Sequence, residues 1–379
     1  MKIGIDARFF GTSGKGLGRY TQKLVEELEK IDHNNQYYIF LNKHNFDEYI
    51  PKNPNFHKVL ANIPWYSWQE QIIFPRILSK YKLNLVHFLH FNIPLFYRKP
   101  YFVTIHDLIL LEYPTRKASK LNSIMYWVKN LGYRLAIMNA VYTSKKVITI
   151  SKYTQQSIYK HFHISQNKMT MIYEGVDLER FNPLNSQKFN FDKFKIKPSK
   201  YILYVGNVYP HKNIDKLIDV FYTLKQRKDI DKDLKLVLVG KKDYFFENII
   251  EQVKSLDLEK SVIFPGYVPD EELISLYENS LFYVFPSLYE GFGLPPLEAI
   301  ALGAPIVISN ATCLPEIFGE YIEYFDPKST DNMQEVLYNF IKDNKKRELQ
   351  KKYHQDILNK YSWSDMAEST KKLYNKSNL

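Results

Sequence analysis

The sequence contains a single cysteine, Cys313, and no long run of hydrophobic residues. One cysteine cannot form an internal disulfide or a thiolate metal cage, so a reducing compartment is the expected setting. The longest stretch in the first part of the chain without Asp, Glu, Lys or Arg, residues 83–97, has 15 residues, whereas a membrane-spanning helix needs about 20 mostly apolar residues. Asp6 and Arg8 interrupt any signal-peptide core. We therefore expect a cytoplasmic protein that crosses no membrane.

Acidic residues are scarce between residues 51 and 150. This region holds 14 Lys and Arg against 3 Asp and Glu, a net +11, which equals the formal charge of the whole 379-residue chain. Such a local excess favours an anionic partner, which could be a phospholipid surface, a diphosphate or nucleic acid. A general bias toward lysine is the plainer explanation, but residues 186–379 hold 27 Lys and Arg against 28 Asp and Glu and do not share the excess.

Short β-rich runs alternate with helical patterns, which is typical of parallel sheets covered by helices on both faces. The expected strands are Lys2–Asp6, Tyr37–Leu41, Asn84–Phe88, Tyr101–Ile105, Lys146–Ile150, Met169–Tyr173, Tyr201–Val205, Leu234–Val239, Ser261–Phe264, Phe282–Phe285 and Pro305–Ile308. The expected helices include Ser119–Thr143, Asn213–Lys228, Tyr244–Leu256, Asp270–Asn279, Leu294–Leu302, Lys345–Tyr361 and Ser364–Lys376.

A polar, lysine-rich stretch with Pro183 and Pro198 separates two such series. The sequence therefore predicts an α/β protein of two Rossmann-like domains. The expected boundaries are an N-terminal domain at 1–182, a linker at 183–200, a C-terminal domain at 201–360 and a final helix within 361–379.

The strongest chemical motif runs from Tyr289 to Ala299 and reads YEGFGLPPLEA. It separates Glu290 from Glu298 by seven residues, with a glycine turn and a predicted helix start between them. Glycines let a backbone approach a ligand closely, and the free N–H groups at a helix N-terminus favour phosphate. The alternative is a tight turn followed by a helix with no ligand, because a Gly-x-Gly alone is weak support for a binding site.

Together with four collinear segments, this motif resembles the retaining glycosyltransferases of family 4, which have the GT-B fold. The segments are Tyr201–Gly206 followed by His211–Asn213, Phe264–Val268 with Glu272 and Tyr277, Ile172–Asp177, and Ser362–Trp363. The resemblance implies that an acceptor-binding N-terminal domain and a nucleotide-sugar-binding C-terminal domain face a central cleft. It also implies that the C-terminal helix crosses back to the N-terminal domain.

The resemblance further implies roles for individual residues. The departing diphosphate would meet Lys212 and backbone amides, Glu298 would bind ribose hydroxyls, and Glu290 and His106 would meet the donor sugar. Many relatives carry arginine where this chain has Asn207 or His211, so phosphate stabilisation is expected to be redistributed. The implied catalytic residues are His106, Glu290 and Lys212. The implied donor-binding residues are Gly16, Gly18, Asn207, Lys212, Tyr267, Val268, Gly291, Phe292, Gly293, Leu294 and Glu298.

Metal binding has little support in the sequence. Asp229-Ile230-Asp231 lies in a lysine-rich turn after a predicted helix, and Lys212 with helix dipoles can replace a cation beside a diphosphate. We therefore expect neither a metal nor another cofactor.

The function that the resemblance favours is retaining transfer of a hexose from a nucleotide-diphosphate sugar to a glycan or lipid-linked glycan. GDP-mannose is the favoured donor, and UDP-glucose and UDP-N-acetylhexosamine are the alternatives. A nucleic-acid-binding protein would explain the positive charge, but no reader motif is evident, and nucleic acid is not an expected partner. A sugar epimerase on the same fold is a third alternative.

The predicted helix Ser119–Thr143 carries an apolar stripe and lies within the basic region. The expected cations on the acceptor side are Arg116, Lys117, Lys120 and Lys129. The surface that they are expected to meet is the anionic inner face of the membrane. The plainer alternative is that the stripe, which includes Trp127, Leu131, Leu135 and Met138, is ordinary core packing.

Overall fold

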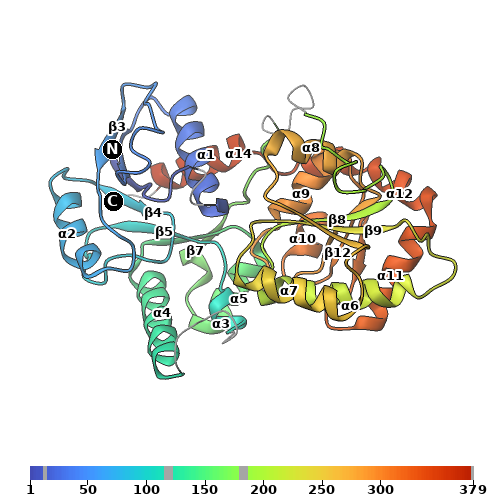
Figure 1. Ribbon diagram of the computed structural model, residues 1–379. Helices are drawn as coiled ribbons and strands as arrows, with labels where there is room; N and C mark the ends of the chain where they lie inside the picture. The colour runs from blue at the N-terminus through green and yellow to red at the C-terminus, as the bar shows by residue number, and fades with distance from the viewer. Residues whose placement is uncertain (12–14, 115–122, 179–186, 377–379) are drawn as a thin grey trace. The chain divides into compact units, whose positions relative to one another are not determined.

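The computed structural model describes residues 1–11, 15–114, 123–178 and 187–376. These residues form two compact units, one from residues 1–112, 123–175 and 361–376, and the other mainly from residues 176–360. Figure 1 labels their helices and strands. None of the described helices combines the length and the apolar composition that crossing a membrane requires.

The first unit is built on a parallel seven-stranded sheet with the strand order β3-β2-β1-β4-β5-β6-β7. Its strands are β1 (Lys2–Asp6), β2 (Gln36–Leu41), β3 (Phe56–Leu60), β4 (Leu85–Phe88), β5 (Tyr101–Ile105), β6 (Lys146–Thr149) and β7 (Met169–Met171). Its helices are α1 (Lys15–Ile31), α2 (Trp68–Ser79), α3 (Ile109–Glu112), α4 (Ser123–Thr143), α5 (Lys152–Phe162) and α14 (Trp363–Lys376). The central strands β4 and β5 are buried at every position because both faces of the sheet are covered.

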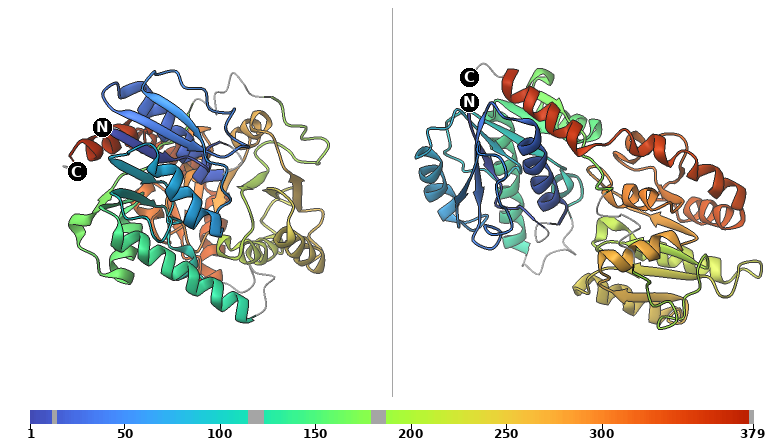
Figure 2. Two further views of the ribbon diagram at one scale, coloured as in Figure 1. Left: turned by 90° about the vertical axis from the view of Figure 1, so that its left-hand side faces the viewer. Right: turned by 90° about the horizontal axis from the view of Figure 1, so that it is seen from above.

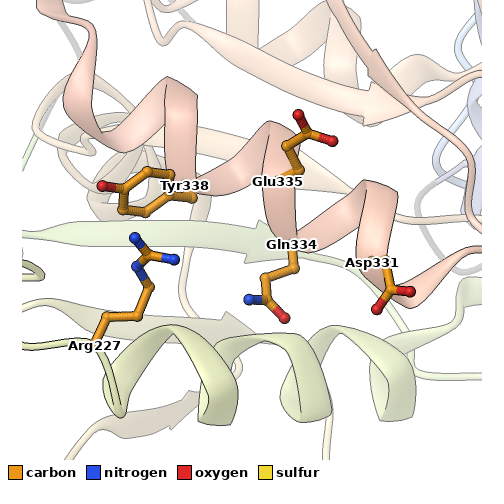
Figure 3. Close-up of a pocket in the computed structure, with 5 residues that line it drawn as sticks. All are labelled: Arg227, Asp331, Gln334, Glu335 and Tyr338. Carbon is orange, nitrogen blue, oxygen red and sulfur yellow. The ribbon is translucent and has the colours of Figure 1, made fainter.

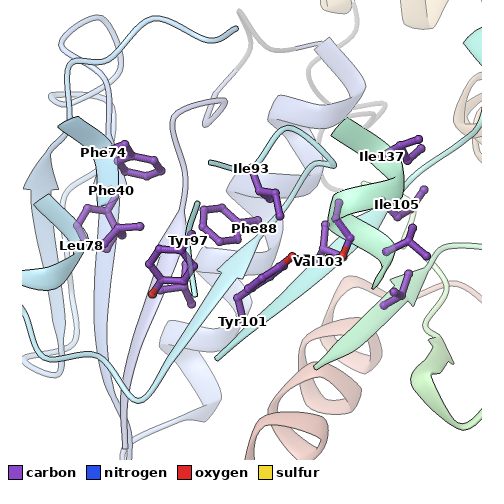
Figure 4. Close-up of a cluster of buried hydrophobic side chains, with 14 of the residues drawn as sticks. Phe40, Phe74, Leu78, Phe88, Ile93, Tyr97, Tyr101, Val103, Ile105 and Ile137 are labelled. Carbon is purple, nitrogen blue, oxygen red and sulfur yellow. Dashed lines mark hydrogen bonds between the residues drawn. The ribbon is translucent and has the colours of Figure 1, made fainter. Parts of the chain in front are cut away.

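One face of this sheet packs against α2 and α4. Phe88 of β4 and Val103 of β5 belong to a buried cluster that also contains Phe74 of α2 and Ile137 of α4 (Figure 4). Because side chains alternate along a strand, the neighbouring residues of β4 and β5 point to the other face. The outer surfaces of α2 and α4 therefore lie on the same side of the first unit.

The opposite face packs against α1 and α14. Tyr374 of α14 hydrogen bonds His87 of β4 and lies against the ring of Phe102 of β5, and α14 packs beside α1 (Figure 2). The prediction that the C-terminal helix crosses back to the N-terminal part of the chain is confirmed.

The second unit is a parallel six-stranded sheet with the order β10-β9-β8-β11-β12-β13. Its strands are β8 (Tyr201–Val205), β9 (Lys235–Val239), β10 (Val262–Gly266), β11 (Phe282–Phe285), β12 (Ile306–Ser309) and β13 (Glu323–Phe325). Its helices are α6 (Ile214–Lys225), α7 (Tyr244–Ser255), α8 (Asp270–Glu278), α9 (Leu294–Ala301), α10 (Leu314–Phe318), α11 (Thr330–Lys342), α12 (Asn344–Lys351) and α13 (His354–Leu358).

The predicted α/β class with two Rossmann-like sheets is confirmed, and several details differ from the prediction, among them helices such as α2, α5 and α11 that were not predicted. The edge strands β3 and β13 were not predicted, because β3 carries His57 and Lys58 and β13 has only three residues. The predicted helix 345–361 is divided into α12 and α13. The described part of the predicted linker packs on the second unit, where Phe189 is buried and stacks with Phe194.

Candidate functional site

In the second unit, Lys212 and Glu290 form a buried ion pair. The Nζ of Lys212 donates to Oε1 of Glu290 at 2.6 Å, although the two residues are 78 positions apart. Only 13% of the lysine side chain and 12% of the glutamate side chain are exposed. Lys212 follows β8 and Glu290 follows β11, so both lie beyond the carboxyl ends of adjacent parallel strands, where ligands bind in open α/β sheets. The structure brings together two of the three predicted catalytic residues.

The segment before α6 holds Lys212 in place. Pro210–Lys212 forms a short 3-10 helix, and Asn213 follows in the left-handed region with φ of 60°. The side-chain amide of Asn213 donates to the carbonyl groups of Pro286 and Pro327, while the amide of Leu288 donates to the carbonyl of His211. These bonds tie the lysine to the loop that carries Glu290.

The loop after β11 is fixed from the side of β12. The amide of Glu290 donates to the hydroxyl of Thr312 at 3.1 Å, and the thiol of Cys313 donates to the carbonyl of Glu290. Gly293 begins α9 with φ of 106°, and a Cβ there would lie 2.8 Å from Leu314. Both the backbone conformation and the packing therefore require glycine at this position. The predicted glycine turn and helix start are present, and the first amides of α9 follow Glu290 closely in the chain.

Glu298 lies in the second turn of α9 and is buried, with 8% of the residue exposed. Glu298 and Glu290 both act on Tyr283 of β11: burial, neighbouring tyrosines and these two carboxylates raise the pKa of its hydroxyl well above the usual value. Both carboxylates therefore lie near enough to the hydroxyl of Tyr283 to act on it, one from before the glycine turn and one from the helix after it.

The positive charge at this site comes from Lys212 and not from the adjacent histidine. Burial, followed by the charge of Lys212, lowers the pKa of His211 to about 4, so its ring is neutral near pH 7. His211 stands where many relatives were expected to have arginine. Lys212 is therefore the charged residue of this segment. That phosphate stabilisation is redistributed in this chain stays a prediction.

The other predicted donor-binding residues of the second unit differ in exposure. The side-chain oxygen of Asn207 is buried and lacks a hydrogen-bond partner in the part of the chain that the structure describes. Such an orphaned acceptor fits a donor group such as a ligand hydroxyl. Val268 is buried, whereas 75% of Tyr267 is exposed. Gly266 has φ of 85° and bends the chain before both residues.

The glycine segment of the first unit forms the beginning of α1. A Cβ on Gly18 would lie 2.1 Å from the carbonyl oxygen of Gly11, so glycine at position 18 is required by the close approach of two backbone segments. A Cβ on Gly16 would meet no atom within 4 Å. Of these two predicted residues, only Gly16 has open space beside it. The intervening residues 12–14 lie outside the described ranges.

His106 lies after β5 in the first unit and contacts Glu174. Its Nδ1 is 3.1 Å from Oε1 of Glu174, and its Nε2 is 3.0 Å from the carbonyl oxygen of Leu89. Both contacts are with oxygen acceptors. They are therefore satisfied together only if the ring carries two protons or Glu174 carries one. Glu174 belongs to the collinear segment Ile172–Asp177, and the resemblance gave it no role beside His106.

Glu174 is positioned by the packing of the next residue. A Cβ on Gly175 would lie 2.3 Å from the backbone nitrogen of Trp363, where α14 begins. Glycine at 175 therefore allows the segment after β7 to approach the start of α14 closely, next to the residue that contacts His106. The sequence around Glu174 does not reveal this partner, because Glu174 and His106 are 68 positions apart and no local spacing relates them.

A buried chain of polar groups runs beside His106. The hydroxyl of Tyr374 lies 2.6 Å from Nδ1 of His87, Nε2 of His87 lies 2.8 Å from the hydroxyl of Thr104, and that hydroxyl is 3.4 Å from Tyr20. The ring of Tyr20 packs edge-on against His106 at 4.7 Å. The C-terminal helix is thereby connected to the surroundings of the predicted catalytic histidine.

The predicted acceptor-side cations are mostly beyond what the structure describes. Arg116, Lys117 and Lys120 lie outside the described residues, and Lys129 lies in α4 without a described side chain. No group of three His, Cys, Asp or Glu side chains that could hold a metal ion occurs within the described ranges. Metal independence stays a prediction.

The second unit also has a cavity of about 190 Å³ between the end of α6 and α11 (Figure 3). The guanidinium of Arg227 stacks on the ring of Tyr338 in its wall, at 3.8 Å. None of the predicted site residues lines this cavity. Its lining residues are Arg227, Asp331, Gln334, Glu335 and Tyr338.

Comparisons with known proteins identify both halves of the chain. Residues 14–180 match Glycosyltransferase Family 4, and residues 186–356 match Glycosyl transferases group 1. The O-antigen chain mannosyltransferase B of Escherichia coli is 26% identical over 95% of each chain. The O-antigen chain mannosyltransferase RfbU of Salmonella typhimurium is 27% identical over 87% of this chain and 88% of its own.

Among solved structures, the sucrose-phosphate synthase of Thermosynechococcus elongatus matches with a TM-score of 0.76 and 17% identity, covering 99% of this chain and 98% of its own. At this identity the match shows the fold alone. The two family matches occupy the two halves of the chain in the expected order. The chain therefore belongs to the glycosyltransferases of family 4, with a group 1 segment as its second half, and it has the GT-B fold.

Proposed function

We propose that this glycosyltransferase moves a hexose, with retention of anomeric configuration, from a nucleotide-diphosphate sugar to a glycan or lipid-linked glycan in the synthesis of a cell-surface polysaccharide. GDP-mannose is the proposed donor, because two relatives that match most of this chain bear mannosyltransferase names. The observation that carries the proposal is the buried Lys212–Glu290 pair beside the start of α9.

The pair suits a leaving group that gains negative charge. A lysine ammonium in a site of low dielectric stabilises a departing diphosphate far more than it would in water. A diphosphate at this position competes with Glu290 for the ammonium and frees the carboxylate to bind sugar hydroxyls. Amides at the N-terminus of α9 add donors to the same oxygen atoms. No metal is needed for this stabilisation.

In the proposed retaining route, the bond between the anomeric carbon and the diphosphate oxygen breaks while the acceptor hydroxyl attacks on the same face of the sugar. The proton of the acceptor hydroxyl passes to the departing phosphate oxygen. His106 orients the donor sugar and is not the base. Contact of its Nε2 with the sugar would replace the present bond to the carbonyl of Leu89.

A thermal-shift series tests the donor. We expect GDP-mannose to raise the unfolding temperature more than UDP-glucose or UDP-N-acetylglucosamine at equal concentration, since a ligand of the folded state stabilises it by mass action. A larger shift with a UDP-sugar would mean that this sugar nucleotide is the donor, and the proposed class of reaction would stand. No shift with any nucleotide sugar would count against the proposal as a whole.

Two glutamine variants test the roles of the carboxylates. Glu298→Gln should mainly raise KM for the donor, because ribose hydroxyls are bound equally in the ground and transition states. Glu290→Gln should mainly lower kcat, because its sugar contact strengthens during transfer. The anomeric configuration of the product, measured by NMR, tests retention, and full activity in EDTA is expected.

A further inference from the structure

The outer side of α4 exposes a stripe of five apolar side chains, Trp127, Leu131, Leu135, Met138 and Tyr142, called the α4 stripe below. Their exposed fractions are 64%, 40%, 48%, 40% and 52%. At 100° per residue, these positions fall within an arc of roughly 80° on one side of the helix. Core packing, the plainer explanation of this pattern in the sequence, does not account for these side chains.

A different side of the same helix supplies its core contacts. Ile137, Ala140 and Val141 are fully buried against the sheet. α4, whose course Figure 1 shows, is therefore anchored by one face and presents a second apolar face outward along most of its length. Exposed apolar patches of this extent on soluble units mark binding surfaces.

More exposed apolar residues lie on the side of the sheet that α4 covers. α2 exposes Trp68 and Ile72, one turn apart, and the loop before β5 exposes Leu95 and Phe96. This loop is attached to α2, because the amide of Leu95 donates to the side chain of Gln71 at 2.7 Å. The apolar surface therefore extends beyond one helix.

The acidic residues of this basic region are all engaged elsewhere. Glu70 is fully buried and pairs with Arg8, Asp107 caps the amide of Ile109, and Glu112 bonds His161. These three are the only acidic residues among residues 51–150, and α4 contains none. Of the three, only Glu70 is fully withdrawn from solvent, and the half-buried Asp107 and Glu112 are outnumbered by the cations of this region.

Cations lie exposed beside the apolar side chains. Arg134 lies between Leu131 and Met138 on α4, at spacings of three and four residues, and its side chain is exposed. Further exposed cations on α2, the loop before β5 and the end of α4 are Arg76, Arg98, Lys99 and Lys145. An apolar stripe flanked by cations complements a surface that is anionic outside and apolar beneath.

We propose that the α4 stripe docks this protein on an anionic phospholipid bilayer. The helix lies along the headgroup layer with Leu131, Leu135 and Met138 inserted toward the acyl chains, and Arg134 pairs with lipid phosphate. Trp127 and Tyr142, near the two ends of the stripe, are residue types enriched at the membrane interface. A second copy of this chain would cover the apolar stripe but would bring the same positive charge against itself.

The docking proposal rests on the proposed function, because it explains how the enzyme would reach a lipid-linked acceptor. A lipid-linked acceptor is held at a bilayer surface, and an enzyme attached there meets it in two dimensions. The expectation that the basic region faces the acceptor then rests on exposed side chains as well as on net charge.

Cosedimentation with vesicles of phosphatidylcholine, with and without one quarter phosphatidylglycerol, tests the docking. We expect the protein to bind only the vesicles with phosphatidylglycerol and to dissociate as salt is raised. Arg134→Gln/Lys145→Gln should weaken binding roughly 25-fold, from about 1 kcal/mol per charge. Leu131→Gln/Leu135→Gln should weaken it about tenfold or more, since half-exposed leucines lose their apolar contact with lipid.

Matched variants in the second unit provide the controls. Leu349→Gln changes an exposed leucine on α12, of which 51% is exposed, and Lys254→Gln/Lys260→Gln removes two exposed charges. Both should bind vesicles as the unmodified protein does. Circular dichroism and unfolding temperature establish that every variant is folded.

Three results would overturn the docking proposal: no binding to phosphatidylglycerol vesicles at low salt, equal binding by the stripe variants, or a dimer that the stripe variants convert to monomers. Transfer to a water-soluble oligosaccharide is measured in parallel. Transfer without vesicle binding rejects the docking and keeps the proposed function, whereas vesicle binding without any transfer rejects the proposed function alone.

Discussion

The two units each place a basic side chain against a carboxylate, but the two pairs differ in what holds them together. Lys212 donates to Glu290 from an ammonium that has only donors. His106 lies between Glu174 and the carbonyl of Leu89, two acceptors that the ring satisfies together only with an added proton. In the second unit, Lys212 can only donate to Glu290. In the first unit, the hydrogen bonds of His106 depend on whether the additional proton lies on its ring or on Glu174.

The difference separates two tasks of a transfer reaction. A fixed ammonium suits the developing charge of a leaving diphosphate. A histidine held from both sides suits the orientation of a sugar, because its ring cannot turn without breaking a bond. Variants that weaken the two pairs should therefore affect different kinetic parameters.

The largest effect is expected from Lys212→Ala. Loss of one preorganised charge contact with the leaving group should cost about 3 kcal/mol of transition-state stabilisation, on the order of 100-fold in kcat/KM. Steady-state kinetics with the donor identified by thermal shift measures this loss. Lys197→Ala is the matched control, because Lys197 pairs with Asp233 at the same 2.6 Å but on the exposed surface. Equal rates in Lys212→Ala and Lys197→Ala would mean that the diphosphate binds elsewhere.

The second largest effect concerns acid stability of the first unit. Burial, followed by the charge of His106, lowers the pKa of His87 to about 3, while an unfolded histidine titrates near 6.5. Between these values the unfolded chain binds the extra proton, so stability falls as pH falls from about 6.5 toward 3. The slope is at most about 1.4 kcal/mol per pH unit, or about 2.7 kcal/mol by pH 4.5.

Hydrogen exchange of the β4 amides at pH 6.5, 5.5 and 4.5 measures this stability locally, after correction for intrinsic exchange rates. His87→Gln should be less stable than the unmodified protein at pH 6.5 but should lose less stability on acidification. A variant with the same pH slope as the unmodified protein would show that another group dominates. His90, whose pKa burial also lowers to about 3, is the first alternative to examine.

The sequence predicted the second unit's site better than the first unit's. Glu290, Gly293 and Glu298 lie within one turn and the helix after it, so local spacing alone places them together. Lys212 was found through the family resemblance, and its ion pair with Glu290 depends on the adjacency of β8 and β11. Sheet order is a tertiary property that no spacing encodes.

In the first unit, the positions of the candidate site residues depend on contacts between distant parts of the chain, which the sequence does not reveal. Glu174 reaches His106 because Gly175 allows close approach to α14, and Gly18 is fixed by the carbonyl of Gly11. The apolar period of α4 was visible in the sequence, but periodicity marks an apolar face without telling whether a neighbour covers it. Only the exposed fractions of residues such as Trp127 distinguish a core helix from a surface one.

A smaller effect should follow Glu174→Gln. The amide keeps the size of the carboxylate and one hydrogen bond to His106, but it loses the charge, which is worth about 1.5 kcal/mol in a charge-assisted bond. We expect kcat to fall roughly tenfold while the affinity for the nucleotide is unchanged. Glu112→Gln is the control, because it alters the other His–Glu contact of the first unit, at 3.2 Å from His161. A loss of nucleotide affinity in Glu174→Gln would contradict the separation of tasks between the units.

The smallest effect is expected from Tyr374→Phe on the C-terminal helix. The ring of Tyr374 is fully buried, and its hydroxyl is hydrogen bonded to Nδ1 of the neutral His87 at 2.6 Å. Removing the hydroxyl leaves that nitrogen without its partner, at a cost of about 1 kcal/mol. The packing of the ring against Phe102 is kept, so α14 should stay docked but exchange its amide hydrogens faster. Tyr321→Phe, on an exposed ring of the second unit, should change stability by less than about 0.5 kcal/mol. If Tyr374→Phe is as stable as the unmodified protein, the other contacts of α14 hold the helix, and the polar chain from α14 toward His106 contributes nothing to its docking.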